Sequence, residues 1–419
     1  MMVNPLFKLM TIVDGLQIFR DSFDYKRYFA NRNEESDLKY ALRRVLAEDI
    51  VAMENIPGFN RSTVDGYALK ASDTFGASGG LPAYLEVTGE IKMSEIPSLL
   101  IRSGQAVQIS TGGMLPEGAD AVVMLEYTEK IDKTMIEVNR PVAAWENVLK
   151  EDEDIKKDEI VFKKGHSLRP QDIGLLAALG WENIPVYKKI GIAIISTGDE
   201  IVPIYSLPKR GQVRDINSYA LGAEVEETGC IPYYRGIIAD NEIALEEELS
   251  QCLKQNEIDM ILVSGGSSVG SRDYTLRVLS HLGPPGILVH GLALKPGKPT
   301  IISLSQQKPI IGLPGHPASA LLVFKNVVSK IIADLKGEIP RYGLVKTIEA
   351  LLEKNIASEG GKEEFIRVLL KKKDNQLWAV PILGKSGMIS TLAKADGYIK
   401  VDLNQEGLYK GEKVTVNLF

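Results

Sequence analysis

The chain has 419 residues, which is too long for one ordinary domain and indicates about two to four. With 44% hydrophobic and 25% charged residues, its composition is typical of globular proteins. Forty-nine basic and 55 acidic residues give a net charge of −6, which argues against a general nucleic-acid binder but still allows a local basic pocket.

The cysteines and the apolar runs set the expected environment. Cys230 and Cys252 are the only cysteines and form no CxxC pair, so we expect a reducing, cytoplasmic setting and no zinc site. No run reaches about 18 apolar residues, so we expect no membrane span. Pro5, Lys8 and Asp14 interrupt the first residues, which lack a small-residue cleavage site. We therefore expect this segment to belong to the fold and not to a signal peptide.

The first half of the chain combines one predicted helix with a β-rich module. A helix is predicted over residues 34–55, because apolar residues recur there at helical spacing, at Leu38, Leu42, Val45 and Leu46. Residues 57–154 contain short apolar runs between Gly, Pro and Thr, such as AYLEVTGEI and TMIEV, which predict strands and turns. A further helix is predicted over residues 170–179, because Gly180 suits its end.

Residues 189–337 have a different pattern. Buried strands without polar alternation, such as KIGIAIIST and IDMILVSGG, alternate with helices such as NEIALEEELSQCLKQN. This pattern predicts a parallel sheet that helices cover on both faces. Residues 341–419 return to short strands and turns and predict a small β-barrel or sandwich.

Ligands of open parallel sheets bind outside the carboxyl ends of the strands, so the residues that follow each predicted strand are candidates. They comprise carboxylates, a glycine-rich loop, a lysine turn and a Pro-Gly-His turn: Glu200, Asp240, Ser264, Gly265, Gly266, Ser267, Ser268, Asp273, Lys295, Lys298, Pro314, Gly315 and His316. The sequence therefore predicts a polar ligand site at this edge of the sheet.

The glycine loop and the lysine turn both suit an anion. The loop from Ser264 can bring backbone N–H groups close to a phosphate, but it lacks the ending of a Walker loop, and a tight strand-to-helix turn remains an alternative. Lys295 and Lys298 are compact charges suited to an oxyanion. A merely solvated turn does not explain Pro296 and Pro299, which stiffen the corner.

The carboxylates have two interpretations. Glu200, Asp240 and Asp273 would repel an anion unless a cation bridges them, and Mg²⁺ prefers a few carboxylates with phosphate oxygens and water. They are candidates for that cation or for ribose hydroxyls. Asp240 also precedes the predicted helix NEIALEEEL, and taken singly we interpret it as the N-cap. His316 is either a structural hydrogen-bonding residue or a ligand contact.

Six motifs occur in an order that resembles the molybdopterin molybdenumtransferases, the proteins related to MoeA and the gephyrin E domain: STVDGYAL, ISTGGMLPEGADAVV, ISTGDE, SGGSSVGSRDYT, ALKPGKPT and GLPGHPASA. The resemblance covers nearly the whole chain. It implies an elongated homodimer that inserts molybdate into adenylylated molybdopterin and releases AMP, the last step of molybdenum cofactor synthesis. Mg²⁺ or a similar divalent cation is the implied cofactor, with no nucleic-acid or membrane partner.

The resemblance also implies four domains. They are a mixed linking domain, a β-rich second domain, a molybdopterin-binding α/β domain and a C-terminal β-barrel domain, expected at residues 1–56 with 155–188, 57–154, 189–340 and 341–419.

Functional positions transfer from the resemblance one by one. Asp65 and Thr111 match residues of the second domain that would reach the partner subunit's cleft, and Asp154 matches an acidic position of a motif usually read Gly-Glu-Asp-Ile. The acidic set and the lysines named above match the family's nucleotide-fold domain, where the lysines hold the oxyanion, and Ser268 lies in the matching glycine loop. Arg367, with Ser386 or Ser390, matches the contribution of the C-terminal domain.

The sequence departs from the family at two positions. Leu149 stands where many relatives carry arginine, although Lys150 follows it, and Gly291 stands where some relatives carry lysine. These changes put oxyanion affinity and the choice between molybdate and tungstate in doubt. Three alternatives stay open: the adenylyltransferase that precedes this step, a non-catalytic scaffold of the gephyrin kind, and a general nucleotide-binding protein.

Overall fold

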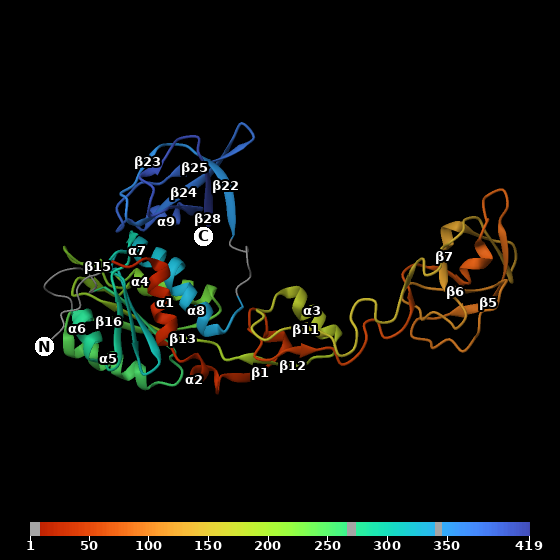
Figure 1. Cartoon of the computed structure of the whole chain (residues 1–419), viewed down its shortest axis with the longest axis horizontal. Coiled ribbons are helices and arrows are strands. Elements are labelled where there is room, and N and C mark those ends of the chain that lie inside the picture. Colours follow the sequence, from red (N-terminus) through yellow and green to blue (C-terminus); the bar gives the residue numbers. More distant parts are fainter. Residues whose placement is uncertain (1–8, 266–273, 340–345) are drawn as a thin grey trace.

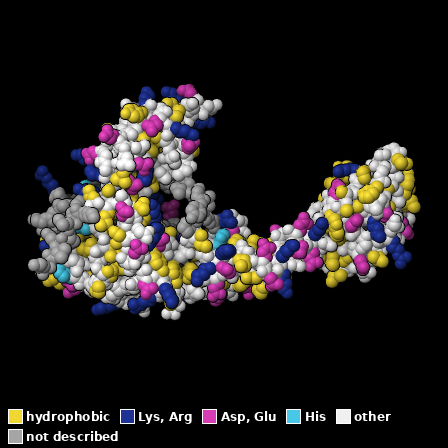
Figure 2. Space-filling model, viewed as in Figure 1, with side chains coloured by type: hydrophobic (Ala, Val, Ile, Leu, Met, Phe, Trp, Pro, Cys, Tyr) yellow, Lys and Arg dark blue, Asp and Glu magenta, His cyan; other side chains and the backbone are white. Residues whose placement is uncertain are grey.

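The computed structural model describes residues 9–265, 274–339 and 346–419. The chain is elongated: an α/β body and a C-terminal barrel lie at one end, and a β-rich module lies at the other (Figure 1). The space-filling view shows the same two lobes joined by a narrow neck, with basic and acidic side chains interspersed on the visible face (Figure 2).

The α/β body contains a six-stranded sheet in the order β16-β13-β17-β21-β20-β18. The strands are β13 (Gly191–Thr197), β16 (Ile231–Ile238), β17 (Met260–Ser264), β18 (Pro285–His290), β20 (Ile301–Ser305) and β21 (Lys308–Leu313). The first four in spatial order are parallel, as predicted. The fifth strand, β20, runs antiparallel to both of its neighbours, β21 and β18. Gln306 and Gln307 adopt positive φ angles (51° and 62°) and form the two-residue hairpin turn between β20 and β21.

Helices cover both faces of this sheet, as the sequence predicts. One face packs against α1 (Ile12–Ser22), α4 (Asn217–Glu227), α7 (Pro317–Val323) and α8 (Ser329–Lys336), and the other packs against α5 (Glu242–Lys254) and α6 (Tyr274–His281). Along β13, Ile192 and Ile194 point to the first core, and Ala193 and Ile195 point to the second. Each fully buried Ile or Leu contributes about 1.5–3 kcal/mol to stability.

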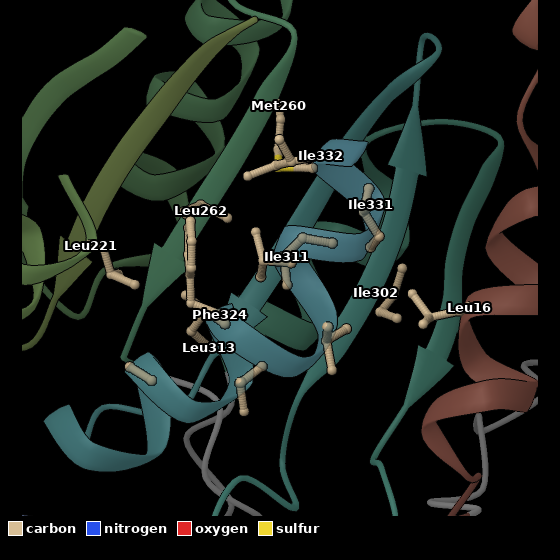
Figure 3. Packing of buried hydrophobic residues seen from close by; sticks show 14 of the residues in the cluster. Leu16, Leu221, Met260, Leu262, Ile302, Ile311, Leu313, Phe324, Ile331 and Ile332 are labelled. Atoms are coloured by element: carbon tan, nitrogen blue, oxygen red, sulfur yellow. The ribbon is translucent and has the colours of Figure 1, made fainter. Parts of the chain in front are cut away.

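The first described helix, α1, is part of this core, whereas residues 1–8 of the segment expected to belong to the fold lie outside the described residues. Leu16 of α1 lies beside Ile302 of β20, on the same side of the sheet as Ile331 and Ile332 of α8 (Figure 3). A π-helical segment, Phe324–Val328, joins α7 to α8, and α8 ends at Gly337 with φ of 64°. In the three described stretches of the chain, no helix is both long and apolar enough to cross a membrane.

The distal module is a six-stranded sheet in the order β7-β4-β6-β5-β9-β8. Its strands are β4 (Gly66–Leu69), β5 (Ala83–Ile91), β6 (Gln105–Ile109), β7 (Ala121–Met124), β8 (Thr128–Lys130) and β9 (Met135–Val138), and β3 (Arg61–Ser62) pairs with β10 (Val148–Leu149) beside them. The prediction of short strands in this part of the chain is confirmed.

The predicted helix over residues 34–55 is wrong. This part holds β1 (Asn33–Asp37), the 3-10 turn Leu38–Tyr40 and β2 (Ile50–Val51), which pair with β12 (Asn183–Tyr187) and β11 (Ile160–Phe162). The N–H of Leu46 donates to the carbonyl of His166, so the backbone bonds across the chain and not along it. The helical spacing reflected burial in part, because Leu46 packs with Leu168 in a small core, whereas Leu42 is 51% exposed. The neighbouring helices are α2 (Tyr25–Phe29) and α3 (Pro170–Ala178), and α3 confirms the second predicted helix.

The C-terminal part is a small closed β-barrel, as predicted. Its ring of strands comprises β22 (Thr347–Leu352), β24 (Glu363–Lys373), β25 (Gln376–Pro381), β26 (Gly397–Val401) and β28 (Lys413–Leu418). The ring closes because β24 pairs with both β25 and β26. Beside it lie the pair β23 (Ile356–Ala357) and β27 (Gly407–Leu408) and the short helix α9 (Ser390–Ala393).

Candidate functional site

A cleft of about 790 Å³ opens at the carboxyl edge of the central sheet, where the sequence predicts a ligand site. Its lining comes from the ends of β13, β16, β17 and β21, from the paired strands β14 (Ile201–Val202) and β15 (Val213–Arg214), and from one loop of the C-terminal barrel. The predicted residues that it brings together are Glu200, Asp240, Gly265, Pro314, Gly315 and His316.

Glu200 and Asp240 both border this cleft. Asp240 does not cap α5, which corrects our interpretation of its role. The side chain of Asn241 accepts the N–H groups of Ile243 and Ala244 at 2.9 and 3.1 Å and is the N-cap. Asp240 stands one residue before the cap, where its N–H donates to Asp199 at 3.0 Å.

Three buried polar residues of the cleft were not predicted from the sequence: Thr197, Asp215 and Asn217. Asn217 is buried, and its amide donates to Ser264 Oγ at 2.6 Å and to the carbonyl oxygen of Gly315 at 2.8 Å. It therefore connects the loops after β17 and β21. The only signal for Asp215 and Asn217 was a run of polar residues at the start of α4, which is equally typical of a helix cap, and Thr197 is the last residue of β13.

Two buried oxygens of the cleft have no hydrogen-bond partner among the described residues: Asn217 Oδ1 and Thr197 Oγ1. Asp215 is the opposite case. It accepts from Ser196 Oγ at 2.8 Å and from the N–H of Ser218 at 3.1 Å, so it is held in place at the start of α4. Because buried polar atoms are normally paired, the two oxygens indicate where a ligand or water would bind.

Only the beginning of the predicted glycine loop lies in the described structure. Gly265 has a φ of 112°, and a Cβ there would lie 2.2 Å from the carbonyl oxygen of Thr197, so only glycine fits. Its N–H donates to Leu313 at 3.3 Å, and Ser264 is held by Asn217. Gly266, Ser267, Ser268 and Asp273 lie outside the described residues.

The lysine turn joins the α/β body to the barrel. Its short strand β19 (Leu294–Lys295) pairs with the start of β24, and Lys295 forms an ion pair with Glu364 at 3.2 Å. Lys298 is exposed, and Pro299 lines the cleft. Gly297 has a φ of 126°, and a Cβ there would lie 2.3 Å from Leu294, so the corner needs glycine.

The backbone conformation explains why glycine occupies position 291. Its φ is 96°, its N–H donates to Thr300 at 2.9 Å, and its carbonyl accepts from Met10 at 3.3 Å. A lysine at this position would adopt a strained left-handed conformation. The departure from some relatives therefore matches the local path of the chain.

The barrel closes one side of the cleft through the loop before α9. Ser386 Oγ lies 2.9 Å from Nδ1 of His316, and the adjoining Gly387 lines the cleft. Arg367 is buried beneath this loop and donates to Thr391 Oγ1 at 2.6 Å and to the carbonyl oxygen of Gly384 at 2.8 Å. Burial lowers the pKa of Arg367. Arg367 thus supports the loop, and Ser390 is exposed at the start of α9.

Asp65 and Thr111 lie together on the distal module. The N–H and hydroxyl of Thr111 donate to one oxygen of Asp65 at 2.7 and 3.2 Å. This module is at the far end of the same chain from the cleft (Figure 1). Asp154 lies in another turn, where its N–H donates to Ile56 at 3.1 Å. One chain therefore does not bring these three residues to Glu200 and Asp240.

The fold and the cleft define a multidomain α/β protein with a polar ligand site at the carboxyl edge of its main sheet. Three family models match its sequence: the MoeA N-terminal region (domain I and II) over residues 10–180, a probable molybdopterin binding domain over residues 193–334, and the MoeA C-terminal region (domain IV) over residues 349–419. The chain belongs to the MoeA family of molybdenum cofactor biosynthesis.

Known proteins agree with this assignment. The chain is 35% identical to a putative molybdopterin biosynthesis protein of Methanocaldococcus jannaschii, over 92% of both chains. It is 32% identical to the molybdopterin molybdenumtransferase of Bacillus subtilis, over 91% of this chain and 88% of that one. A crystal structure of the MoeA molybdopterin biosynthesis protein of Pyrococcus horikoshii OT3 has a TM-score of 0.82 at 31% identity, covering 98% of this chain and 100% of the other.

Proposed function

We propose that this protein is a molybdopterin molybdenumtransferase, which inserts molybdate into adenylylated molybdopterin and releases AMP. The observation that carries the proposal is the cleft of about 790 Å³ beside the lysine turn, which combines three carboxylates with two buried oxygens that have no partner among the described residues. This volume lies in the range of small-molecule sites, about 300–1,000 Å³. The B. subtilis relative carries the name of this activity.

The buried end of the cleft would bind the organic part of the substrate. Asn217 Oδ1 is an acceptor, and Thr197 Oγ1 is both donor and acceptor. Substrate N–H and hydroxyl groups would satisfy both atoms. A ligand without such groups would leave them unpaired, at a cost of about 1–3 kcal/mol each.

The lysine turn would hold the oxyanion. Pro299 places this turn on the wall of the cleft, and the exposed ammonium group of Lys295 keeps donors available while it pairs with Glu364. Holding molybdate next to the dithiolene sulfurs of molybdopterin lowers the entropic cost of their reaction. Molybdate and tungstate share charge and shape, so this arrangement serves both.

The cleft also fits a divalent cation. Among the described residues, no group of three or more His, Cys, Asp or Glu side chains forms a complete metal site. Mg²⁺ needs less, because it commonly takes one or two carboxylates together with substrate phosphates and water. We assign Glu200 and Asp240 to this role, with Asp273 beyond the described residues as a third candidate. When bound, the ion would neutralise phosphate charge during cleavage of the phosphoanhydride.

A homodimer would complete the site. The bonded pair Asp65–Thr111 sits on a module that its own chain holds far from the cleft (Figure 1). A second copy can bring its module to the first copy's cleft, and closed twofold symmetry would form two such sites. We further propose the four-domain division given above, and a cytoplasmic location, which suits the two buried free cysteines.

The test is molybdate-dependent AMP release by the purified protein from adenylylated molybdopterin in the presence of Mg²⁺. Release that requires molybdate, and that Lys295→Ala abolishes while the circular dichroism spectrum is unchanged, supports the proposal. Adenylylation of molybdopterin from Mg-ATP would instead assign the preceding step. Tight binding without turnover would indicate a scaffold, and stabilisation by AMP alone that equals stabilisation by molybdopterin with AMP would indicate a general nucleotide binder.

A further inference from the structure

The C-terminal barrel carries a second hollow of about 790 Å³ that is unrelated to the cleft. Three separate segments form it: the turn after β22, the end of the β24–β25 hairpin and the loop before β28. Its lining consists of five lysines, one glutamate, one asparagine and one tryptophan: Lys354, Lys371, Lys372, Lys373, Lys410, Glu353, Asn355 and Trp378.

The hollow is strongly basic on a chain of the opposite charge. Five lysines against one glutamate leave a local charge of +4, whereas the whole chain carries −6. In the described part of the chain, none of the five lysines forms an ion pair, although other barrel lysines do, such as Lys362 with Glu359 and Lys400 with Asp402. Crowded like charges without counter-ions are unfavourable, so an anionic partner would gain by binding here.

One aromatic side chain, Trp378, lines the hollow. Trp378 is half-buried and lies directly opposite Lys371 in the β24–β25 ladder, so both side chains are on one face of the hairpin. On the neighbouring strand, Leu351 is its register partner. Asn355 ties the third segment to the first, because its side-chain oxygen accepts from the N–H of Lys410 at 2.7 Å. The lysines of three segments therefore line one hollow together with the side chain of Trp378.

Protection of a strand edge explains only part of this arrangement. Lysines at the end of a hairpin oppose edge-to-edge aggregation, which would account for residues 371–373. It does not account for Lys354 and Lys410, which come from other segments and line the same hollow as the hairpin. Their convergence indicates a binding surface.

We propose that this hollow, the lysine–Trp378 hollow, docks an acidic polypeptide segment that places an apolar side chain over Trp378 and carboxylates among the lysines. A concave surface that combines one half-buried aromatic side chain with several cationic ones fits such a segment. Single-stranded nucleic acid is less suited, because it stacks successive bases on several aromatic side chains. A membrane is less suited, because it requires a broad apolar face, and this lining offers one half-buried aromatic side chain among charged ones.

The test uses the full-length chain and a glutamate-rich probe peptide with one central phenylalanine. Substituting Trp145→Phe and Trp181→Phe leaves Trp378 as the only tryptophan, so its fluorescence reports this hollow alone. We expect the peptide to change the fluorescence, and added salt to weaken binding. Lys371→Glu with Lys373→Glu should weaken binding at least about tenfold. The same peptide with glutamine in place of glutamate should not bind.

Matched control variants distinguish the effect of charge in the hollow from the effect of the net charge of the whole chain. Lys156→Glu with Lys157→Glu makes the same change of charge on exposed residues outside the barrel and should leave peptide binding unchanged. Trp378→Leu should weaken binding of the phenylalanine peptide more than binding of an all-glutamate peptide, with binding measured by the fluorescence anisotropy of labelled peptides. Equal binding by the Lys371/Lys373 variant overturns the proposal. Tighter binding of a single-stranded oligonucleotide or of phosphatidylglycerol vesicles, lost in the same variant, overturns it as well.

Discussion

Lys295 of the α/β body forms an ion pair with Glu364 of the C-terminal barrel, with 3.2 Å between Nζ and the carboxylate oxygen. The two residues are register partners in the β19–β24 pairing, so the backbone fixes them opposite each other. Ser358 holds the second oxygen of Glu364 at 2.8 Å. The lysine assigned to the oxyanion is thus partly neutralised by the barrel before any ligand binds.

Removing the negative charge of Glu364 should strengthen oxyanion binding. Glu364→Gln keeps the size of the side chain and its contact with Ser358 but deletes a negative charge beside Lys295. We expect molybdate to bind about threefold to tenfold more tightly, measured by titration calorimetry, because the repulsion between the carboxylate and the anion is lost.

Glu349→Gln provides the matched control, because Glu349 pairs with Lys413 on the same barrel and not with the lysine turn. It should leave molybdate affinity unchanged. If Glu364→Gln binds molybdate more weakly than the wild type, Glu364 orients Lys295 for the ligand and the neutralisation argument is wrong.

Asn217 should matter for substrate binding more than for folding. Asn217→Ala deletes the hydrogen bonds to Ser264 and Gly315 and the side-chain oxygen that has no partner among the described residues. We expect AMP release at subsaturating substrate to fall at least about tenfold, because both loop placement and a ligand contact are lost. Thermal unfolding should change far less.

Asn326→Ala is the comparison for this variant. Asn326 also makes amide hydrogen bonds in the α/β body, to Leu322 and Tyr398, but it does not line the cleft. AMP release by the Asn326→Ala variant should stay near that of the wild type. Equal losses in both variants would mean that Asn217 acts through stability alone.

The sequence was most informative where a strand ends in polar residues. Glu200, Asp240 and His316 could be placed at one edge because parallel strands share that edge. The helix prediction over residues 34–55 was wrong because buried residues at helical spacing also occur where an extended segment bonds to other segments, as Leu46 does with His166. The Lys295–Glu364 pair depends on strand pairing between distant segments, which no local pattern encodes.

The separation of Asp65 and Thr111 from the cleft leads to a complementation experiment. Asp65→Asn and Lys295→Ala should each be inactive alone. In a mixed dimer, one cleft would carry both changes and the other neither, provided that the partner subunit supplies Asp65. Random mixing should therefore restore about a quarter of wild-type AMP release. Mixtures that stay inactive after subunit exchange would place Asp65 outside the partner's cleft or outside the reaction.

A buried carboxylate in the linking region makes stability depend on pH. Asp172 is 2% exposed and lies at the start of α3, where it bonds to His166 at 2.8 Å and to Arg169 at 2.8–2.9 Å. Burial alone would raise its pKa, but the hydrogen bonds from Arg169 and His166 outweigh burial and lower the pKa from 3.8 to about 2. The charged form of Asp172 therefore stabilises the folded state.

The sign and the range of this effect follow from the two pKa values. Because the folded pKa is below the unfolded one, the stabilisation is complete above pH 3.8 and is lost as the pH falls toward about 2. Its size is about 2 kcal/mol. Denaturant unfolding, followed by Trp181 in a Trp145→Phe, Trp378→Phe background, should show Asp172→Asn less stable at pH 7 and the difference shrinking below pH 4. The control Asp132→Asn, which changes an exposed carboxylate of the distal module, should leave this transition unchanged. If the stability difference between Asp172→Asn and the parent chain stays constant with pH, Asp172 acts by packing and not by charge.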